Sequence, residues 1–246
     1  MNTKRGQVTL FVIIATLIIV GVIAMFYFTT LNKGQALGVG EAGKVKSYID
    51  LCIQQTTETG LQSLGWQGGY IYPKNESIKY GLLDISYWDY SGQDISPSLN
   101  TLENQLSMFM NEFVPYCNDW SFFPGMNITA GNALTKTVIN KDYLTIDVKW
   151  PVSVIDKNNR VTSFEQFSKK FYIRIGRIYN VSRQIVAEEI KNQNNFCISC
   201  INDLAFNNGL TVNMFYFEDS LIFTIYDMSS KINNTNYEFK FANKLK

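Results

Sequence analysis

The sequence contains no histidine among its 246 residues. Histidine is the commonest general base, the commonest zinc ligand and the usual partner of a nucleophilic serine or cysteine, so every site that depends on a histidine is excluded. Neither a GxxxxGK[ST] nor a GxSxG motif occurs. We therefore expect no enzyme, no catalytic residue, no metal site, no cofactor and no small-molecule substrate.

The sequence also lacks an excess of either charge. The formal net charge is +1 and no basic run stands out, so nucleic acid is not an expected partner. Acidic pairs such as Glu188-Glu189 fit no spacing for general acid–base catalysis. A membrane-bound enzyme would need a pocket with convergent carboxylates such as Asp84, Asp89 or Asp227.

Apolar residues are concentrated near the N-terminus. Residues 8–28 read VTLFVIIATLIIVGVIAMFYF and carry no charge, and a helix of this length spans about 30 Å, the thickness of a bilayer core. We predict a basic leader at residues 1–6, a transmembrane helix at 7–31 and the lipid bilayer as a partner. Lys4 and Arg5 favour a single-pass protein with a cytoplasmic N-terminus and an extracytoplasmic main domain. The predicted anchor residues are Val8, Phe11, Ile14, Ile18, Val22, Phe26 and Phe28.

The segment Lys4-Arg5-Gly6-Gln7-Val8-Thr9-Leu10-Phe11 resembles the class III signal of archaeal type IV pilin-like proteins. The resemblance covers roughly the first 30 residues. It implies that a prepilin peptidase cuts between Gly6 and Gln7, and that the partners are copies of the chain or other pilin-like subunits. The remainder, with QGGYIY at 67–72 and FANKLK at its end, is similar to uncharacterised membrane-anchored proteins of small-genome archaea.

After a glycine-rich stalk at residues 32–43, residues 44–246 are expected to form one α+β domain. The absence of βαβα alternation predicts antiparallel strands, packed with three to four amphipathic helices. We expect a helix from Lys44 that stops at Gly68-Gly69, and one that starts with an Asn100–Glu103 capping box and ends at Pro115. Further helices are expected at 175–190 and 198–206. Strands are expected at 70–72 and 78–90 as a hairpin, and at 134–155, 161–173, 210–217, 221–226 and 237–241.

The four cysteines are Cys52, Cys117, Cys197 and Cys200. Without histidine a zinc site would need all four, and the CxxC pair lacks the neighbours of a thioredoxin motif. Two disulfides are the favoured interpretation, with 52–117 and 197–200 as the preferred pairing of the three that are open. Reduced core thiols, or a redox or metal role, remain as alternatives.

Two further patterns bear on surface chemistry. Sequons place glycosylation candidates at Asn75, Asn127 and Asn233, whereas a fourth, at Asn180, falls inside a predicted helix. Aromatic residues gather between positions 66 and 90, where they suit a platform for sugars or a membrane surface, although cross-strand packing is favoured. The aromatic residues are Trp66, Tyr70, Tyr72, Tyr80, Tyr87, Trp88 and Tyr90.

Together these features favour a membrane-anchored, pilin-like cell-surface protein. It would act as a structural or adhesive component of a surface filament or envelope assembly. The alternative is a permanently tethered extracytoplasmic binding or sensor domain that does not assemble, which a flexible stalk at 34–43 would suit.

Overall fold

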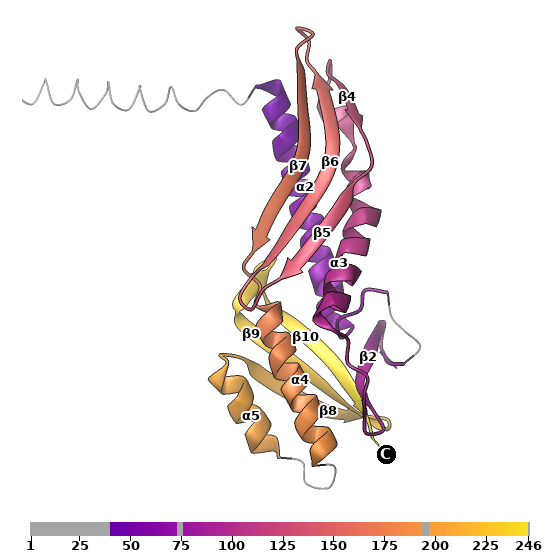
Figure 1. Ribbon diagram of the computed structural model, residues 1–246, viewed down its shortest axis with the longest axis vertical. Helices are drawn as coiled ribbons and strands as arrows, with labels where there is room; N and C mark the ends of the chain where they lie inside the picture. The colour runs from indigo at the N-terminus through magenta and orange to yellow at the C-terminus, as the bar shows by residue number, and fades with distance from the viewer. Residues whose placement is uncertain (1–39, 73–75, 193–196, 246) are drawn as a thin grey trace, which may run out of the picture. The chain divides into compact units, whose positions relative to one another are not determined.

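A computed structural model describes residues 40–72, 76–192 and 197–245. The chain divides into two compact units, residues 1–44 and 45–246, and of the first only residues 40–44 are described. The second unit contains two β-sheets and the helices α2, α3, α4 and α5 (Figure 1).

The larger sheet has the strand order β1-β2-β10-β9-β8, with β3 also paired to β2. Its neighbours are antiparallel except for β2 and β10, which run parallel. Helix α4 lies against this sheet, and α5 lies beside β8 (Figure 1). The elements are β1 (Ser77–Tyr80), β2 (Leu83–Tyr90), β3 (Gln93–Asp94), α4 (Ile175–Lys191), α5 (Ile198–Asn207), β8 (Thr211–Phe217), β9 (Ser220–Ile232) and β10 (Thr235–Lys244).

The smaller sheet is antiparallel and centres on β6, which pairs with β4 and β5 along one edge and with β7 along the other. Helices α2 and α3 lie beside it (Figure 1). Its elements are α2 (Glu41–Trp66), α3 (Leu99–Phe113), the 3₁₀ turns η1 (Val114–Cys117) and η2 (Trp120–Phe122), β4 (Asn127–Ala130), β5 (Leu134–Ile139), β6 (Leu144–Ile155) and β7 (Val161–Phe171).

A column of polar side chains on α3 covers the outer edge of β5. Glu103 Oε1 accepts from the N–H of Ile139 at 2.8 Å, and Ser107 Oγ accepts from the N–H of Thr137 at 3.0 Å. Asn111 continues the column on the next turn, where its Oδ1 accepts from Thr135 N at 2.6 Å. Four residues of a helix rise about 6 Å, and two residues of a strand rise about 6.6 Å. Every fourth residue of α3 therefore meets every second residue of β5, and these hydrogen bonds protect the edge of β5 from pairing with another strand.

Helix α2 ends where the sequence predicted, at the glycine pair. Gly68 has φ +70° and the N–H of Gly69 donates to Leu64 O at 2.8 Å, which is the hydrogen bond of a Schellman C-cap. The start differs from the prediction, because α2 begins at Glu41 and so includes the last three residues of the predicted stalk.

Several predicted elements need correction. The hairpin is formed by β1 and β2, whereas residues 70–72 form no strand. Ser98 caps α3 in place of Asn100: its Oγ accepts from Thr101 N, and Glu103 is engaged with β5. The prediction of a purely antiparallel domain is wrong, since the parallel β2–β10 pair makes the larger sheet mixed.

The prediction of a single-pass membrane protein with a long N-terminal transmembrane helix is also contradicted. Within residues 40–72, 76–192 and 197–245, no helix is long and apolar enough to cross a membrane. Residues 7–31, to which that helix was assigned, lie outside these ranges. The fold and localisation predictions are corrected on this point.

Candidate binding site

A cavity of about 400 Å³ lies at the edge of β2 that faces away from β10. Strands β1 and β3 both pair with this edge, β1 with residues 83–86 and β3 with residues 89–90. Residues 87 and 88 lie between these two paired stretches. The cavity, called the tyrosine pocket below, is lined by Tyr70, Glu76, Ser86, Tyr87, Tyr90, Gln93 and Ile95.

The β2–β3 hairpin fixes one wall of the tyrosine pocket. Ser91 and Gly92 both have positive φ, +55° and +91°, as a two-residue type I′ turn requires. Asp89 Oδ1 accepts from Gly92 N at 2.7 Å and holds the turn in place. Tyr90 and Gln93 become cross-strand partners, so their side chains emerge together at the pocket.

The segment after α2 supplies the opposite wall. The side-chain carbonyl of Gln105 on α3 accepts from the N–H groups of Ile71 at 3.0 Å and Tyr72 at 2.9 Å. These bonds hold a short non-helical, non-strand stretch against the domain. Tyr70, immediately before it, is only 3% exposed and lines the pocket.

Ser86 also lines the pocket, but its hydroxyl is buried. Ser86 is 1% exposed, and its Oγ has no hydrogen-bond partner among the described residues. Leaving such a group unpaired costs about 1–3 kcal/mol, and unsatisfied buried groups are few in native proteins. The Oγ atom is also closed to solvent, so Ser86 lines the pocket without offering its hydroxyl to a ligand.

The remaining lining groups suit a ligand with both apolar and hydroxyl-bearing faces. Tyr87 and Tyr90 lie edge to face at 5.5 Å between ring centroids, and the Tyr87 hydroxyl is engaged with Ser220 Oγ at 2.9 Å. The Glu76 carboxylate and the Gln93 amide add an acceptor and a donor–acceptor pair. Aromatic faces combined with a few placed polar groups are typical of small-molecule binding sites.

The aromatic cluster predicted from the sequence divides between binding and packing. Tyr70, Tyr87 and Tyr90 line the pocket. Trp88 is fully buried, donates from Nε1 to Gly68 O at 2.9 Å and stacks on Phe241 at 5.0 Å, as the packing interpretation expects. Tyr80 contacts Phe215 and Phe217, and so belongs to the side of the sheet near β8.

Sequence reasoning missed three polar lining residues, Glu76, Ser86 and Gln93. A serine inside the apolar run from Ile85 to Trp88 was a signal, because such a run is typical of a buried central strand. The Ser91-Gly92 dipeptide was another, since it places Gln93 opposite Tyr90 once it is recognised as a hairpin turn. Glu76 carried no signal of its own.

The carboxylates that an enzyme would need do not converge. The register places Asp89 beside Asn243, which pairs with Leu221 of β9. Asp227 lies six residues further along β9, roughly 20 Å away at the rise of a strand.

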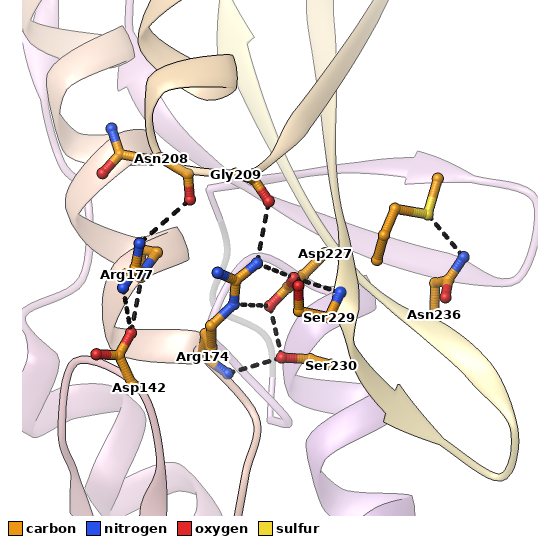
Figure 2. A network of polar contacts seen from close by, with 10 residues as sticks. Asp142, Arg174, Arg177, Asn208, Gly209, Asp227, Ser229, Ser230 and Asn236 are labelled. Carbon is orange, nitrogen blue, oxygen red and sulfur yellow. Dashed lines mark hydrogen bonds and ion pairs between the residues drawn. The ribbon is translucent and has the colours of Figure 1, made fainter.

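Asp227 belongs to a separate buried network (Figure 2). Its side chain is fully buried and accepts from Arg174 Nε at 2.9 Å, from Arg174 Nη2, from Ser230 Oγ and from Ser229 N at 2.9 Å. Burial alone would raise the pKa of Asp227, but these hydrogen bonds outweigh it and hold the pKa below its usual range. With about four acceptor positions filled, the carboxylate is a structural centre with no position left for a substrate.

Glu189 is an acid with an unusual environment. Burial raises the pKa of Glu189 to about 7, and the nearby charge of Asp89 raises it further. The Asn243 amide donates a hydrogen bond to the Glu189 carboxylate and so partly lowers the pKa. Its neighbour Glu188 is exposed, so the two acids of this pair lie in different environments.

Both disulfides named in the sequence analysis are present. Cys52 on α2 is bonded to Cys117 in η1 across 65 residues, and Cys197 is bonded to Cys200 at the start of α5. Among the described residues no group of three or more Cys, Asp or Glu side chains could hold a metal ion.

Other predicted surface sites fall in different places. Asn127 is exposed on β4, and Asn233 is exposed in the β9–β10 turn with φ +49°. Asn180 lies within α4, as predicted. Asn75, the processing site Gly6-Gln7 and all the predicted anchor residues lie outside the described residues.

The glycine run also contains a GxGxxG spacing, at 38–43. That motif binds dinucleotides when its helix leads into a second, parallel strand of a βαβ unit. Here the first strand after α2 is β1, which pairs antiparallel with β2 in a hairpin, so the spacing carries no such function. No family model matches the sequence, and no curated protein matches it at a significant level.

Proposed function

We propose that the protein is an adhesive subunit that binds carbohydrate in the tyrosine pocket. The observation that carries the proposal is a cavity walled by the rings of Tyr70, Tyr87 and Tyr90, with the polar residues Glu76 and Gln93 also in its lining. A sugar ring presents apolar C–H faces to aromatic rings and hydroxyls to polar groups such as Glu76 and Gln93.

The test is binding of the full-length chain to an array of defined mono- and oligosaccharides, followed by calorimetric titration of the strongest binder. Tyr90→Ala should weaken binding about tenfold or more, which corresponds to about 1.4 kcal/mol.

Tyr80→Ala is the matched control. Tyr80 and Tyr90 are almost equally exposed, 39% and 38%, and both end a strand of the same sheet, but Tyr80 does not line the pocket. Equal losses in the two variants, or no saccharide bound above background, would contradict the proposal.

A second candidate is a structural subunit that assembles with copies of itself. Four exposed apolar side chains, called the disulfide patch below, lie around Cys52–Cys117: Leu51 (53% exposed), Phe113 (39%), Tyr116 (74%) and Phe122 (67%). The rings of Phe113 and Tyr116 are 6.1 Å apart. The disulfide holds α2 and η1 together, so the patch is organised before any partner binds, which lowers the cost of association.

This candidate agrees with the resemblance of residues 4–11 to pilin-like signals. A photo-cross-linking amino acid at position 116 of the full-length chain should give products at multiples of the 28.1 kDa subunit mass. Position 216 is the control, because Tyr216 is equally exposed at 73% but lies on β8. Equal cross-linking from both positions would count against assembly through the disulfide patch.

A further inference from the structure

The Cys197–Cys200 disulfide differs from Cys52–Cys117 in its exposure and in the loop that it closes. Cys197 and Cys200 are both exposed, whereas Cys117 is fully buried. The exposed bond spans three residues and the buried one 65. A disulfide stabilises a fold mainly by restricting the unfolded chain, so the three-residue span stabilises the fold less than the 65-residue one does.

The position of Cys197 on α5 favours its thiolate. Cys197 is the N-cap residue of this ten-residue helix, and its Sγ accepts from the N–H of Cys200 at 3.3 Å. Unpaired N–H groups and the helix dipole at an N-terminus stabilise negative charge and lower the pKa of a thiol placed there. A Cys197 sulfur released by reduction is therefore a good leaving group and a good nucleophile.

A small cavity is lined by the disulfide and by two acidic residues. It has a volume of about 40 Å³, and its lining includes Cys197, Cys200, Glu188 and Glu189. The pKa of Glu189, which burial raises to about 7, allows this group to carry a proton at neutral pH and also to release it. Beside the disulfide, Ile198 is 55% exposed and offers an apolar contact to an approaching chain.

We propose that Cys197–Cys200 is a redox-active disulfide that oxidises pairs of thiols in polypeptide partners. A partner thiolate attacks Cys197 Sγ and forms a mixed disulfide as the Cys197–Cys200 bond breaks. Cys200 leaves as a thiolate and takes up a proton from the Glu189 carboxylic acid. The second partner thiol loses its proton to solvent and attacks its neighbour's sulfur, which releases the Cys197 thiolate. Two electrons pass from the partner dithiol, now a disulfide, to the cysteine pair.

A trapping experiment on the full-length chain tests the proposal. Cys200→Ser leaves Cys197 as a free thiol, and Cys197→Ser leaves Cys200. Each variant is mixed at pH 7 with a synthetic peptide that contains one internal disulfide, and the mixed disulfide is followed by mass spectrometry. If the helix lowers the pKa of Cys197 by a unit or more from 8.5, the larger thiolate fraction at pH 7 outweighs the lower nucleophilicity of that thiolate, and Cys200→Ser should trap the peptide about two- to threefold faster than Cys197→Ser.

A second measurement addresses Glu189. The otherwise unaltered chain, with Cys197–Cys200 oxidised, should oxidise the reduced dithiol form of the peptide, and Glu189→Gln should slow this step about tenfold. Glu188→Gln is the matched control and should slow it less. Intact Cys52–Cys117 and an unchanged circular dichroism spectrum establish that each variant is folded.

The proposal is overturned if the two cysteine variants trap the peptide at equal rates. It is also overturned if the oxidised chain reacts with the dithiol peptide no faster than oxidised glutathione does at the same concentration. Because neither variant alters the tyrosine pocket, failure here leaves carbohydrate binding to be judged by its own experiment.

Discussion

Replacing Arg174 with methionine removes two of the four hydrogen bonds that the buried Asp227 carboxylate accepts (Figure 2). The contacts from Ser230 Oγ and Ser229 N remain, but the compensating positive charge is lost. Arg174 Nη2 also donates to Gly209 O at 3.0 Å, which lies between α5 and β8. One substitution therefore leaves a buried charge unpaired and detaches a connecting segment.

The size of the effect follows from burial. The Asp227 side chain is 0% exposed and that of Arg174 only 17%, and breaking a buried pair from one side typically costs about 3–5 kcal/mol. We expect Arg174→Met to lower the free energy of unfolding by about this amount. Because the pKa of Asp227 is depressed in the folded wild type, its contribution is present above the unfolded pKa and lost as pH falls through the folded value.

The assay is equilibrium unfolding in urea at pH 7, followed by tryptophan fluorescence. Trp88 in the larger sheet and Trp150 in the smaller one are both buried, so unfolding of either sheet changes the emission. Arg177→Met is the control: this arginine, one helical turn later, pairs with the half-exposed Asp142, and such a pair contributes about 1 kcal/mol or less.

The double variant Arg174→Met/Asp227→Leu decides whether the unpaired charge is the cause. It removes both charges, and well-packed apolar replacements of buried pairs are often neutral or stabilising, so it should recover most of the loss. If Arg174→Met costs no more than Arg177→Met, or the double variant is less stable than the single one, the reasoning is refuted.

Four further substitutions have expected outcomes in the same unfolding assay. Gly65→Ala should cost about 2 kcal/mol or more, because its Cβ would lie 2.3 Å from Glu238 O, whereas Gly131→Ala, with no atom nearer than 3.6 Å, should stay within about 1 kcal/mol. Because the pKa of Glu189 is raised, the folded state keeps a proton between roughly pH 4.5 and 7 that the unfolded state has lost. The free energy of unfolding should therefore fall by about 1.4 kcal/mol for each pH unit across this window. Glu189→Gln should abolish this slope. Cys117→Ser, which opens the 65-residue loop, should cost about 4 kcal/mol in the chain-entropy model.

The helices were largely predictable because their apolar spacing is local. Leu102, Leu106, Phe109 and Met110 form the buried face of α3, as the 3/4 period indicated. The cap was misassigned because Asn100 and Glu103 have the sequence spacing of a capping box. In the structure Glu103 instead accepts a hydrogen bond from the N–H of Ile139. That contact depends on where β5 lies, and so it could not be deduced from the helix sequence alone.

The sheet pairing was not predictable in the same way. Alternation identified most strands, but it does not state which strand pairs with which. The parallel β2–β10 pair joins residues near 89 to residues near 243, and its register depends on how the whole larger sheet is built. The tyrosine pocket depends on the same fact, since it exists only because β10 occupies one edge of β2 and leaves the other to β1 and β3.

The two disulfides differ in how much they stabilise the domain. In the chain-entropy model a 65-residue loop contributes about 4 kcal/mol and a four-residue one about 2 kcal/mol. Structural need therefore explains the buried Cys52–Cys117 bond, which ties α2 to the end of α3, better than it explains the exposed one. A bond at a helix N-terminus, beside a proton-carrying acid, has instead the surroundings that make sulfur reactive. If reactivity is its role, loss of Cys197–Cys200 should change exchange chemistry far more than it changes the free energy of unfolding.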